Sequence, residues 1–323
     1  MSSNGTTTSG AVNHQLVWLI TGTTSGFGQR LVHAALARGD RVIATARSQA
    51  KLDSFYAEFK ALQPNPEGNE AASPSYDLLN KKENLVTVQL DITEGEESLK
   101  SKVKKASEIW GRIDVLVNNA AVGMLGFVEE GGSARFRQQF ESNVFGVIDM
   151  AVATLPYLRQ SRGTLINVGS RSAWKTSLTG IGAYAASKAA VHAFSETLAL
   201  EVAPLGVRVA IVAPGTFRTE GMYGQPYYLG NPISDYDSGR EASISRFASV
   251  PGTERGDPAK AMELLVDLVR GEGKLAGDKG WNGTARYLIL GSDAVGDAEA
   301  YSRKIADISG EWRPFGKLLQ FED

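Results

Sequence analysis

Tyr184 and Lys188 are the residues whose types and spacing best suit chemistry. They stand four positions apart, so on an α-helix they lie on one face and reach the same ligand. A free tyrosine has a pKa of about 10 and exchanges protons poorly at neutral pH. A neighbouring ammonium favours the phenolate, and a shift of about three pKa units corresponds to roughly 4 kcal/mol. We therefore predict that Lys188 lowers the pKa of Tyr184 and makes it a general acid and base.

A glycine-rich turn near the start of the chain indicates what such a group acts on. Residues 15–20 form a short apolar run typical of a buried strand, and residues 21–28 carry Gly22, Gly26 and Gly28. A helical pattern follows as far as Gly39, and 41–46 reads as a second strand. In this context such a turn binds a dinucleotide pyrophosphate at the helix N-terminus. The same spacing alone also fits an ordinary tight turn.

The remaining chain repeats the alternation of strands and helices. Further strands are predicted at 85–92, 113–117, 163–168, 207–212 and 286–290, and helices at 48–62, 133–158 and 182–203. We predict a single α/β domain, a doubly wound and mostly parallel sheet of about seven strands. It spans 14–310, with a disordered tail at 1–13 and a C-terminal tail at 311–323. A surface insertion is expected at 63–83, a substrate loop at 216–256 that is irregular from 221, and a short helical segment after the last strand.

Composition excludes several classes of function. The chain has 323 residues, with 34 basic and 36 acidic side chains, so neither nucleic acid nor an anionic membrane is expected as a partner. It has no cysteine and three scattered histidines, which excludes thiol chemistry and argues against a metal cluster. No apolar run is long enough to span a membrane. We expect a cytoplasmic protein.

Taken together, these motifs resemble the short-chain dehydrogenase/reductase family, which has a Rossmann-like fold. The turn has the family's Thr-Gly-x-x-x-Gly-x-Gly form, and Tyr184 and Lys188 match its Tyr-x-x-x-Lys pair. The strand at 113–117 runs into Asn-Asn-Ala-Ala at 118–121, where most relatives have Asn-Asn-Ala-Gly. Ala121 is the departure, and it affects the backbone freedom of that turn.

The resemblance implies a catalytic set of Asn143, Ser170, Tyr184 and Lys188. Ser170 would hydrogen-bond the substrate oxygen, Tyr184 would protonate it, Lys188 would also hold the nicotinamide ribose, and Asn143 would seat a relay water. Ser170 precedes Tyr184 by 14 positions, one more than is usual in the family, whereas Ser172 would give 12. We prefer Ser170 because the residues before it match the family's strand end.

The resemblance also implies a nicotinamide cofactor and no metal. Arg47 follows Ala46, where NAD-specific sites commonly carry a carboxylate. An arginine there can pair with a 2′-phosphate, so we predict NADP(H). The expected cofactor-binding residues are Gly22, Thr24, Ser25, Gly26, Phe27, Gly28, Arg47, Asp91, Ile92, Asn118, Ala120, Tyr184, Lys188, Pro214, Gly215, Phe217 and Thr219.

The predicted reaction is reversible hydride transfer between NADPH and a ketone or secondary alcohol. Five aromatic residues in the substrate loop indicate an apolar or ring-bearing substrate, namely Tyr223, Tyr227, Tyr228, Tyr236 and Phe247. Reduction of a C=N or activated C=C bond is one alternative, and a non-catalytic NADP(H)-binding sensor is another. The family resemblance favours a homo-dimer or homo-tetramer.

Overall fold

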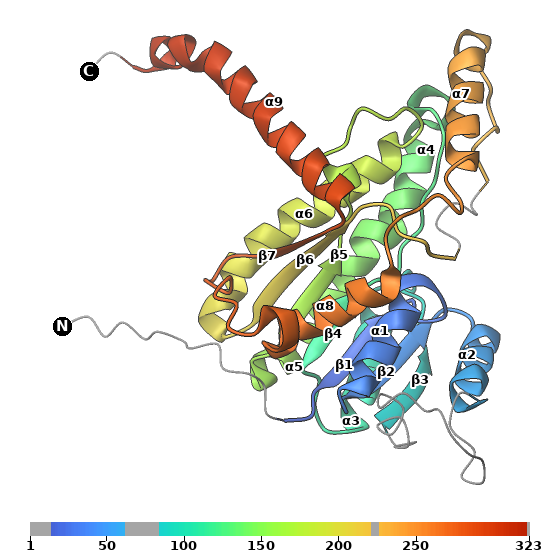
Figure 1. Ribbon diagram of the computed structural model, residues 1–323, viewed down its shortest axis with the longest axis vertical. Helices are drawn as coiled ribbons and strands as arrows, with labels where there is room; N and C mark the ends of the chain where they lie inside the picture. The colour runs from blue at the N-terminus through green and yellow to red at the C-terminus, as the bar shows by residue number, and fades with distance from the viewer. Residues whose placement is uncertain (1–13, 62–83, 221–225, 322–323) are drawn as a thin grey trace.

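The computed structural model describes residues 14–61, 84–220 and 226–321 (Figure 1). The predicted tail at 1–13, the insertion at 63–83 and Tyr223 lie outside these residues.

Seven strands form one sheet in the order β3-β2-β1-β4-β5-β6-β7. They are β1 Val17–Thr21, β2 Arg41–Ala46, β3 Leu85–Gln89, β4 Val115–Asn118, β5 Thr164–Val168, β6 Arg208–Pro214 and β7 Arg286–Leu290. Every neighbouring pair is parallel. The central strands are buried on both faces, which explains their uninterrupted apolar runs. The predicted doubly wound fold is confirmed.

Helices cover both faces of the sheet. They are α1 Gly26–Ala37, α2 Gln49–Ala61, α3 Glu96–Glu108, α4 Val128–Phe140, α5 Gly146–Ser161, α6 Gly182–Val202, α7 Asp237–Ala248, α8 Pro258–Arg270 and α9 Ser292–Gly316. α1, α2 and α8 share one apolar core with the sheet, and α3, α5 and α6 share the other. No helix among the described residues is long and apolar enough to cross a membrane.

Three helical segments differ from the sequence prediction. The stretch predicted as one helix over 133–158 is divided, because a π-helical turn at Glu141–Phe145 separates α4 from α5. The segment 221–256, predicted to be irregular, contains α7. The short helical segment after β7 is instead the 25-residue α9, which continues past the predicted boundary at 311 and projects from the body of the molecule (Figure 1).

The strand order gathers the predicted site at one edge. From β1 the chain adds strands toward one edge of the sheet, first β2 and then β3. It then returns to the other side of β1, where β4 to β7 are added toward the opposite edge, so the direction of strand addition reverses between β1 and β4. Ligands of such sheets bind at the carboxyl ends of the strands, next to this reversal. The segments that follow β1, β4, β5 and β6 therefore meet there, and they carry most of the predicted site residues.

Candidate active site

Ser170 and Tyr184 come together beyond the end of β5. The Ser170 hydroxyl lies close enough to the Tyr184 phenol to lower its pKa against the effect of burial, and Ser170 is 6% exposed. The Ser172 backbone N–H donates to Ser170 Oγ at 3.0 Å, so the serine rotamer is fixed by the turn that follows it. The structure thus brings Tyr184 to Ser170, the serine that we prefer, while Ser172 serves as the donor that orients it.

The pKa of Tyr184 is raised, which is opposite to the predicted direction. Burial is the dominant cause, and the hydrogen bond with Ser170 opposes it. The Lys188 ammonium nitrogen lies 5.9 Å from the centroid of the tyrosine ring and donates to the Val168 carbonyl at 2.7 Å. The expected electrostatic lowering is therefore wrong for this arrangement, because desolvation of the phenol outweighs the distant charge.

Burial destabilises the charged form of Lys188. Its side chain is buried, with 3% exposure, and burial lowers its pKa to about 8. The ammonium is held in place by the carbonyl at the end of β5. A buried cation next to a neutral phenol stabilises any negative charge that develops on the phenol oxygen.

His192 is a site residue that the sequence analysis did not single out. Its Nε2 accepts a hydrogen bond from the Ser170 backbone N–H at 3.3 Å, and a Cβ added at Gly169 would lie 2.1 Å from the same nitrogen. Burial, followed by the charge of Lys188, lowers the pKa of His192 to about 4. The imidazole is therefore a neutral acceptor behind the serine. Its position one turn after Lys188 is the only sequence signal for this role.

Asn143 lies within the π-helical turn, and its side chain is fully buried. Its Oδ1 accepts from Val122 N at 2.9 Å, and its Nδ2 donates to Val122 O at 2.9 Å and to Ser187 Oγ at 3.3 Å. The amide thus joins the loop after β4 to α6 next to Lys188.

The glycine-rich turn is packed too closely for side chains. Gly22 has φ +70°, and a Cβ there would lie 2.9 Å from the Ala120 Cα. A Cβ at Gly28 would lie 2.2 Å from the Gly22 carbonyl oxygen. Asn119 Nδ2 donates to the carbonyls of Thr21 and Gly22 at 2.9 and 3.0 Å. Asn119, absent from the predicted set, is the side chain that links the turn to β4.

The turn after β4 accommodates Ala121 without a left-handed backbone conformation. Arg162 is the one non-glycine residue at positive φ in the described part of the chain, so Ala121 has an ordinary backbone conformation. Ala120 N donates to Thr21 Oγ1 at 3.0 Å. Asn118 is buried, donates to Asn167 Oδ1 at 2.9 Å, and keeps its own Oδ1 without a hydrogen-bond partner.

The segment after β6 lies against the start of α1. The rings of Phe27 and Phe217 meet edge to face, with their centroids 5.2 Å apart, and the Thr219 Cβ lies 3.7 Å from the Cβ position of Gly26. Glu220, which the sequence analysis did not single out, accepts from Gly26 N at 3.0 Å and from Arg30 at 2.6 Å. The glycine-rich turn and the segment after β6, both predicted to bind the cofactor, are therefore in contact.

The Pro214–Gly215 turn is tied to α9. Asp293 Oδ2 accepts from the backbone N–H and the hydroxyl of Thr216 at 2.8 and 2.7 Å, and a Cβ at Gly215 would lie 1.9 Å from Asp293 Oδ1. Arg171, next to Ser170, pairs with Asp293 and also with Asp297 at 2.9 Å. Although partial burial opposes it, these donors hold the pKa of Asp293 below its usual value. The base of α9 therefore contacts both the serine turn and the Pro-Gly turn.

The remaining predicted cofactor residues flank α1. Arg47 follows the end of β2 and is exposed, and no described residue hydrogen-bonds or pairs with its guanidinium. Asp91 accepts from Thr93 N and Oγ1 at 3.0 and 2.8 Å, and the neighbouring Ile92 is buried. Thr24 is half-buried. Ser25 is the N-cap residue of α1, and its hydroxyl makes no capping hydrogen bond.

These residues fit a nicotinamide dinucleotide. Backbone N–H groups and the helix dipole at the N-terminus of α1 favour an anion, and the Glu220 carboxylate bonded to Gly26 N occupies this position in the structure. Asn118 adds an unpartnered buried acceptor at the next strand end. In the described part of the chain, no group of three or more His, Asp or Glu side chains is placed to hold a metal ion.

The segment predicted to cover the substrate is anchored on α4. The ring of Tyr236 stacks on Phe127, and its hydroxyl donates to Glu129 at 2.6 Å. The ring of Tyr228 lies under Arg135, 5.2 Å from the guanidinium carbon, and Tyr227 OH bonds Ser243 Oγ at 3.3 Å. These rings serve to pack the segment, which weakens the inference from aromatic content to a ring-bearing substrate.

A buried ion pair reinforces this anchoring. Arg240 on α7 pairs with Glu130 on α4, and their side chains are 9% and 1% exposed. Asp237 also pairs with Arg240. α7 is thus fixed to α4 by charge as well as by aromatic packing.

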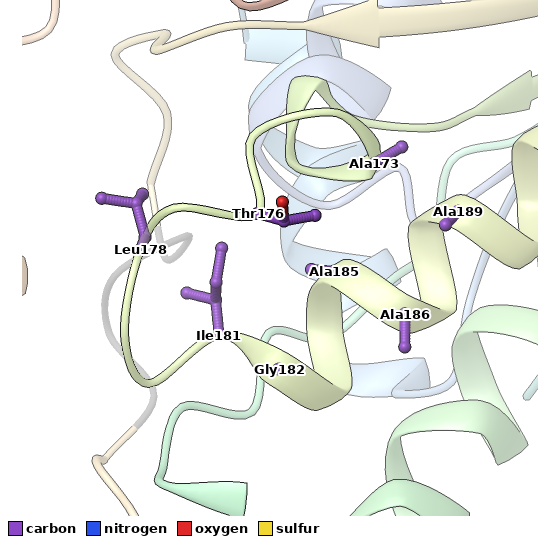
Figure 2. Close-up of a pocket in the computed structure, with 8 residues that line it drawn as sticks. All are labelled: Ala173, Thr176, Leu178, Ile181, Gly182, Ala185, Ala186 and Ala189. Carbon is purple, nitrogen blue, oxygen red and sulfur yellow. The ribbon is translucent and has the colours of Figure 1, made fainter. Parts of the chain in front are cut away.

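An apolar cavity of about 260 Å³ lies beside the loop that connects Ser170 with Tyr184 (Figure 2). It is lined by Ala173, Thr176, Leu178, Ile181, Gly182, Ala185, Ala186 and Ala189. The positions that α6 contributes, 182, 185, 186 and 189, share one face of the helix, which differs from the face of Tyr184 and Lys188. The cavity therefore adjoins the reacting groups without containing them.

Comparisons with known proteins agree with the geometry. The family model described as short chain dehydrogenase matches residues 65–225. An oxidoreductase of Botryotinia fuckeliana, BOA17, is 30% identical over 92% of this chain and 96% of its own. An 11-beta-hydroxysteroid dehydrogenase of Sesamum indicum is 27% identical over 91% of this chain and 81% of its own.

A solved short-chain dehydrogenase from Streptomyces avermitilis superposes with a TM-score of 0.73 at 31% identity, covering 95% of this chain and 100% of that one. The fold, the glycine-rich turn and the likeness along nearly the whole chain agree, and this protein belongs to the short-chain dehydrogenase family of oxidoreductases.

Proposed function

We propose that the protein transfers hydride between NADP(H) and a ketone or secondary alcohol, with reduction as the main direction. The observation that carries the proposal is that the buried Ser170 hydroxyl acts on the Tyr184 phenol, with the buried Lys188 ammonium 5.9 Å from the centroid of the tyrosine ring. This arrangement holds a carbonyl oxygen between two hydroxyl groups at the edge of the sheet where a dinucleotide fits. The hydride is the chemistry that the nicotinamide supplies when bound.

The proton chemistry follows from the protonation states. A raised pKa keeps the Tyr184 phenol protonated at neutral pH, which is the form that donates a proton to the substrate oxygen. Ser170 donates to the same oxygen and stabilises its developing charge. Lys188, with a pKa of about 8, is mostly cationic at pH 7 and stabilises the phenolate left after transfer.

Replacing Tyr184 tests this reaction. Tyr184→Phe removes the proton donor and keeps the ring, so we expect turnover to fall by about 10²–10⁴-fold while NADPH affinity changes little. NADPH consumption with a ketone panel and a fluorescence titration of the cofactor measure the two quantities. Tyr157→Phe on α5 is the matched control, since Tyr157 packs on the core. Turnover by Tyr184→Phe close to that of the unchanged protein would refute the assignment.

The preference for NADP(H) rests on Arg47 and Ala46. Arg47 is exposed and has no partner among the described residues, and Ala46 supplies no carboxylate that would repel a 2′-phosphate. We expect Arg47→Glu to weaken NADPH binding at least tenfold and to change NADH binding far less. The ratio of kcat/KM for the two cofactors measures this. Equal losses with both would mean that Arg47 does not read the phosphate.

The class of substrate is proposed to be apolar. Its support is the similarity to a steroid dehydrogenase along most of the chain and the apolar cavity beside the loop between Ser170 and Tyr184. A homo-oligomer built through α5 and α6 is also proposed, because Phe145, Val152 and Leu200 are 51%, 40% and 59% exposed there. The domain limits of 14 and 310 and a cytoplasmic location stay predictions.

A further inference from the structure

α9 carries an apolar stripe that no other described part of the chain covers. Ile305, Ile308, Trp312 and Phe315 are 44%, 40%, 67% and 53% exposed. Their spacings of three and four place them on one face of the helix. Ala294, at the base, is the one buried residue of α9, and the helix leaves the body as a free rod (Figure 1).

The stripe has the period of a coiled coil. Apolar residues alternate at spacings of three and four along Ala298, Tyr301, Ile305, Ile308, Trp312, Phe315 and Leu319. This is the a/d pattern whose side chains interlock with those of a second helix. An ordinary surface helix that packs on its own domain would bury this face, and α9 does not.

We propose that α9 pairs with α9 of a second copy of this chain as two antiparallel helices that pack along this stripe and are centred on Ile308. In this register Ile308 faces its own counterpart, Ile305 faces Trp312 of the other copy, and Tyr301 faces Phe315. Each large side chain meets another apolar one. The interface is isologous, as expected for a two-fold dimer.

The charges beside the stripe select this orientation. Lys304 and Glu311 flank it on the same side, and antiparallel pairing about Ile308 places Lys304 of one helix next to Glu311 of the other, twice by symmetry. In a parallel pair the residue opposite Lys304 is Ser309, which offers no charge. Between Glu299 and Gly316 the acidic and basic residues are equal in number, three of each, whereas helices that lie on anionic lipid carry an excess of Lys and Arg.

The pairing also fits the size of the two bodies. Ile308 lies 16 residues beyond the start of α9, about 24 Å along the axis, so antiparallel helices keep the bodies at opposite ends. The same register sets Gly316, the last residue of α9, opposite Ala300 of the other copy, about one turn from Asp297. Asp297 holds Arg171 and Lys175 at 2.9 and 2.7 Å, next to Ser170. The tip of each helix therefore ends about one turn from the residues that border its partner's candidate site.

The oligomeric mass of the full chain tests the pairing, independently of the proposed reaction. Ile308→Glu places two carboxylates face to face at the centre, and we expect native mass spectrometry and sedimentation equilibrium to give half the mass of the unchanged protein. The circular dichroism spectrum should not change, because Ile308 is exposed in the single chain. Ala306→Glu, at an exposed position off the stripe, is the control and should keep the full mass.

A charge exchange tests the orientation. We expect Lys304→Glu and Glu311→Lys each to weaken assembly about tenfold, because each places like charges together twice. The double variant should restore the assembly, and so should an equimolar mixture of the two single variants.

Three results would overturn the proposal. The first is an unchanged oligomeric mass for Ile308→Glu. The second is that neither the double variant nor the mixture of single variants recovers assembly. The third is that the Ala306→Glu chain, but not the Ile308→Glu chain, binds phosphatidylcholine/phosphatidylserine vesicles while the two have the same oligomeric mass.

Discussion

The glycine-rich turn and the cover over the substrate side are held in place by different forces. In the turn, backbone segments pack directly against each other, so that a Cβ added at Gly28 would lie only 2.2 Å from the Gly22 carbonyl oxygen. Asn119 also donates to two backbone oxygens of the turn. The cover is fixed by charged pairs, among them Glu130 with Arg240. The first depends on the absence of side chains, and the second depends on their presence.

The interacting residues of the two regions also differ in how far apart they lie in the sequence. The glycines of the turn lie within seven positions of each other, so a local motif records them. Arg240 and Glu130 are 110 positions apart, and Arg171 and Asp297 are 126 apart. Charged residues at such distances give no local signal, because a paired arginine and a solvated one look alike in a sequence.

The largest effect on stability is expected from breaking the buried pair. Arg240→Leu leaves Glu130, which is 1% exposed, as an uncompensated buried carboxylate, and removal of one partner from such a pair costs about 3–5 kcal/mol. Urea unfolding measures the free energy, and hydrogen exchange over 237–248 shows whether α7 detaches first. Glu130→Gln combined with Arg240→Leu should recover much of the loss. A loss below about 1 kcal/mol for Arg240→Leu alone would show that charge does not hold the cover.

An intermediate effect is expected in the turn. Gly28→Ala forces a methyl group against the Gly22 carbonyl, and overpacking of this kind costs about 1–3 kcal/mol. Because the turn moves, cofactor affinity should fall as well, as a titration would show. Gly296→Ala is the control, since a Cβ there meets nothing within 4 Å, and it should stabilise α9 by about 0.5–1 kcal/mol. Equal behaviour of the two variants would contradict close packing of the turn.

The smallest effect on stability is expected at Glu220, which joins the segment after β6 to the start of α1. The hydrogen bonds from Arg30 lower the pKa of Glu220 from 4.5 to about 2. A carboxylate with a lowered folded-state pKa stabilises the fold above its ordinary pKa, and this contribution is lost as the pH falls from about 4.5 toward 2. Glu220 is 58% exposed, so solvent screening limits the contribution to less than about 1 kcal/mol.

We expect Glu220→Gln to lower the free energy of unfolding slightly at pH 7, with the difference vanishing near pH 2 and in high salt. Thermal unfolding at several pH values measures this. A difference that persisted at low pH would have a cause other than the carboxylate charge.

The sequence predicted the sheet because each strand is an apolar run bounded by polar turns, and burial on both faces requires such runs. It also indicated Tyr184 and Lys188 through their helical spacing, and Ser170 through the resemblance to the family. Their predicted roles are not tested by these observations. The direction of the Tyr184 pKa shift was wrong because it depends on burial of the phenol, which a helical spacing does not express.

Other features depended on contacts that only the folded chain makes. His192 acts behind Ser170 because Gly169 lets the imidazole approach. α7 exists in a segment rich in glycine and tyrosine because Arg240 and Tyr236 anchor its start to α4. The π-helical turn at Glu141–Phe145 accompanies the bonds between Asn143 and Val122. Local propensity alone favours none of these.

Because α9 is attached to the described part of the chain only through its first turns, a small tilt at its base displaces its far end by a larger distance. Asp293 and Asp297 fasten its first turns to Thr216, Arg171 and Lys175, and its 25 residues extend about 37 Å. A tilt of about 3° at the base moves the tip of such a rod by about 2 Å. Sub-ångström rearrangements of the two turns that flank Ser170 are thus magnified at the far end, where a spin label or fluorophore at residue 316 would register them from outside the site.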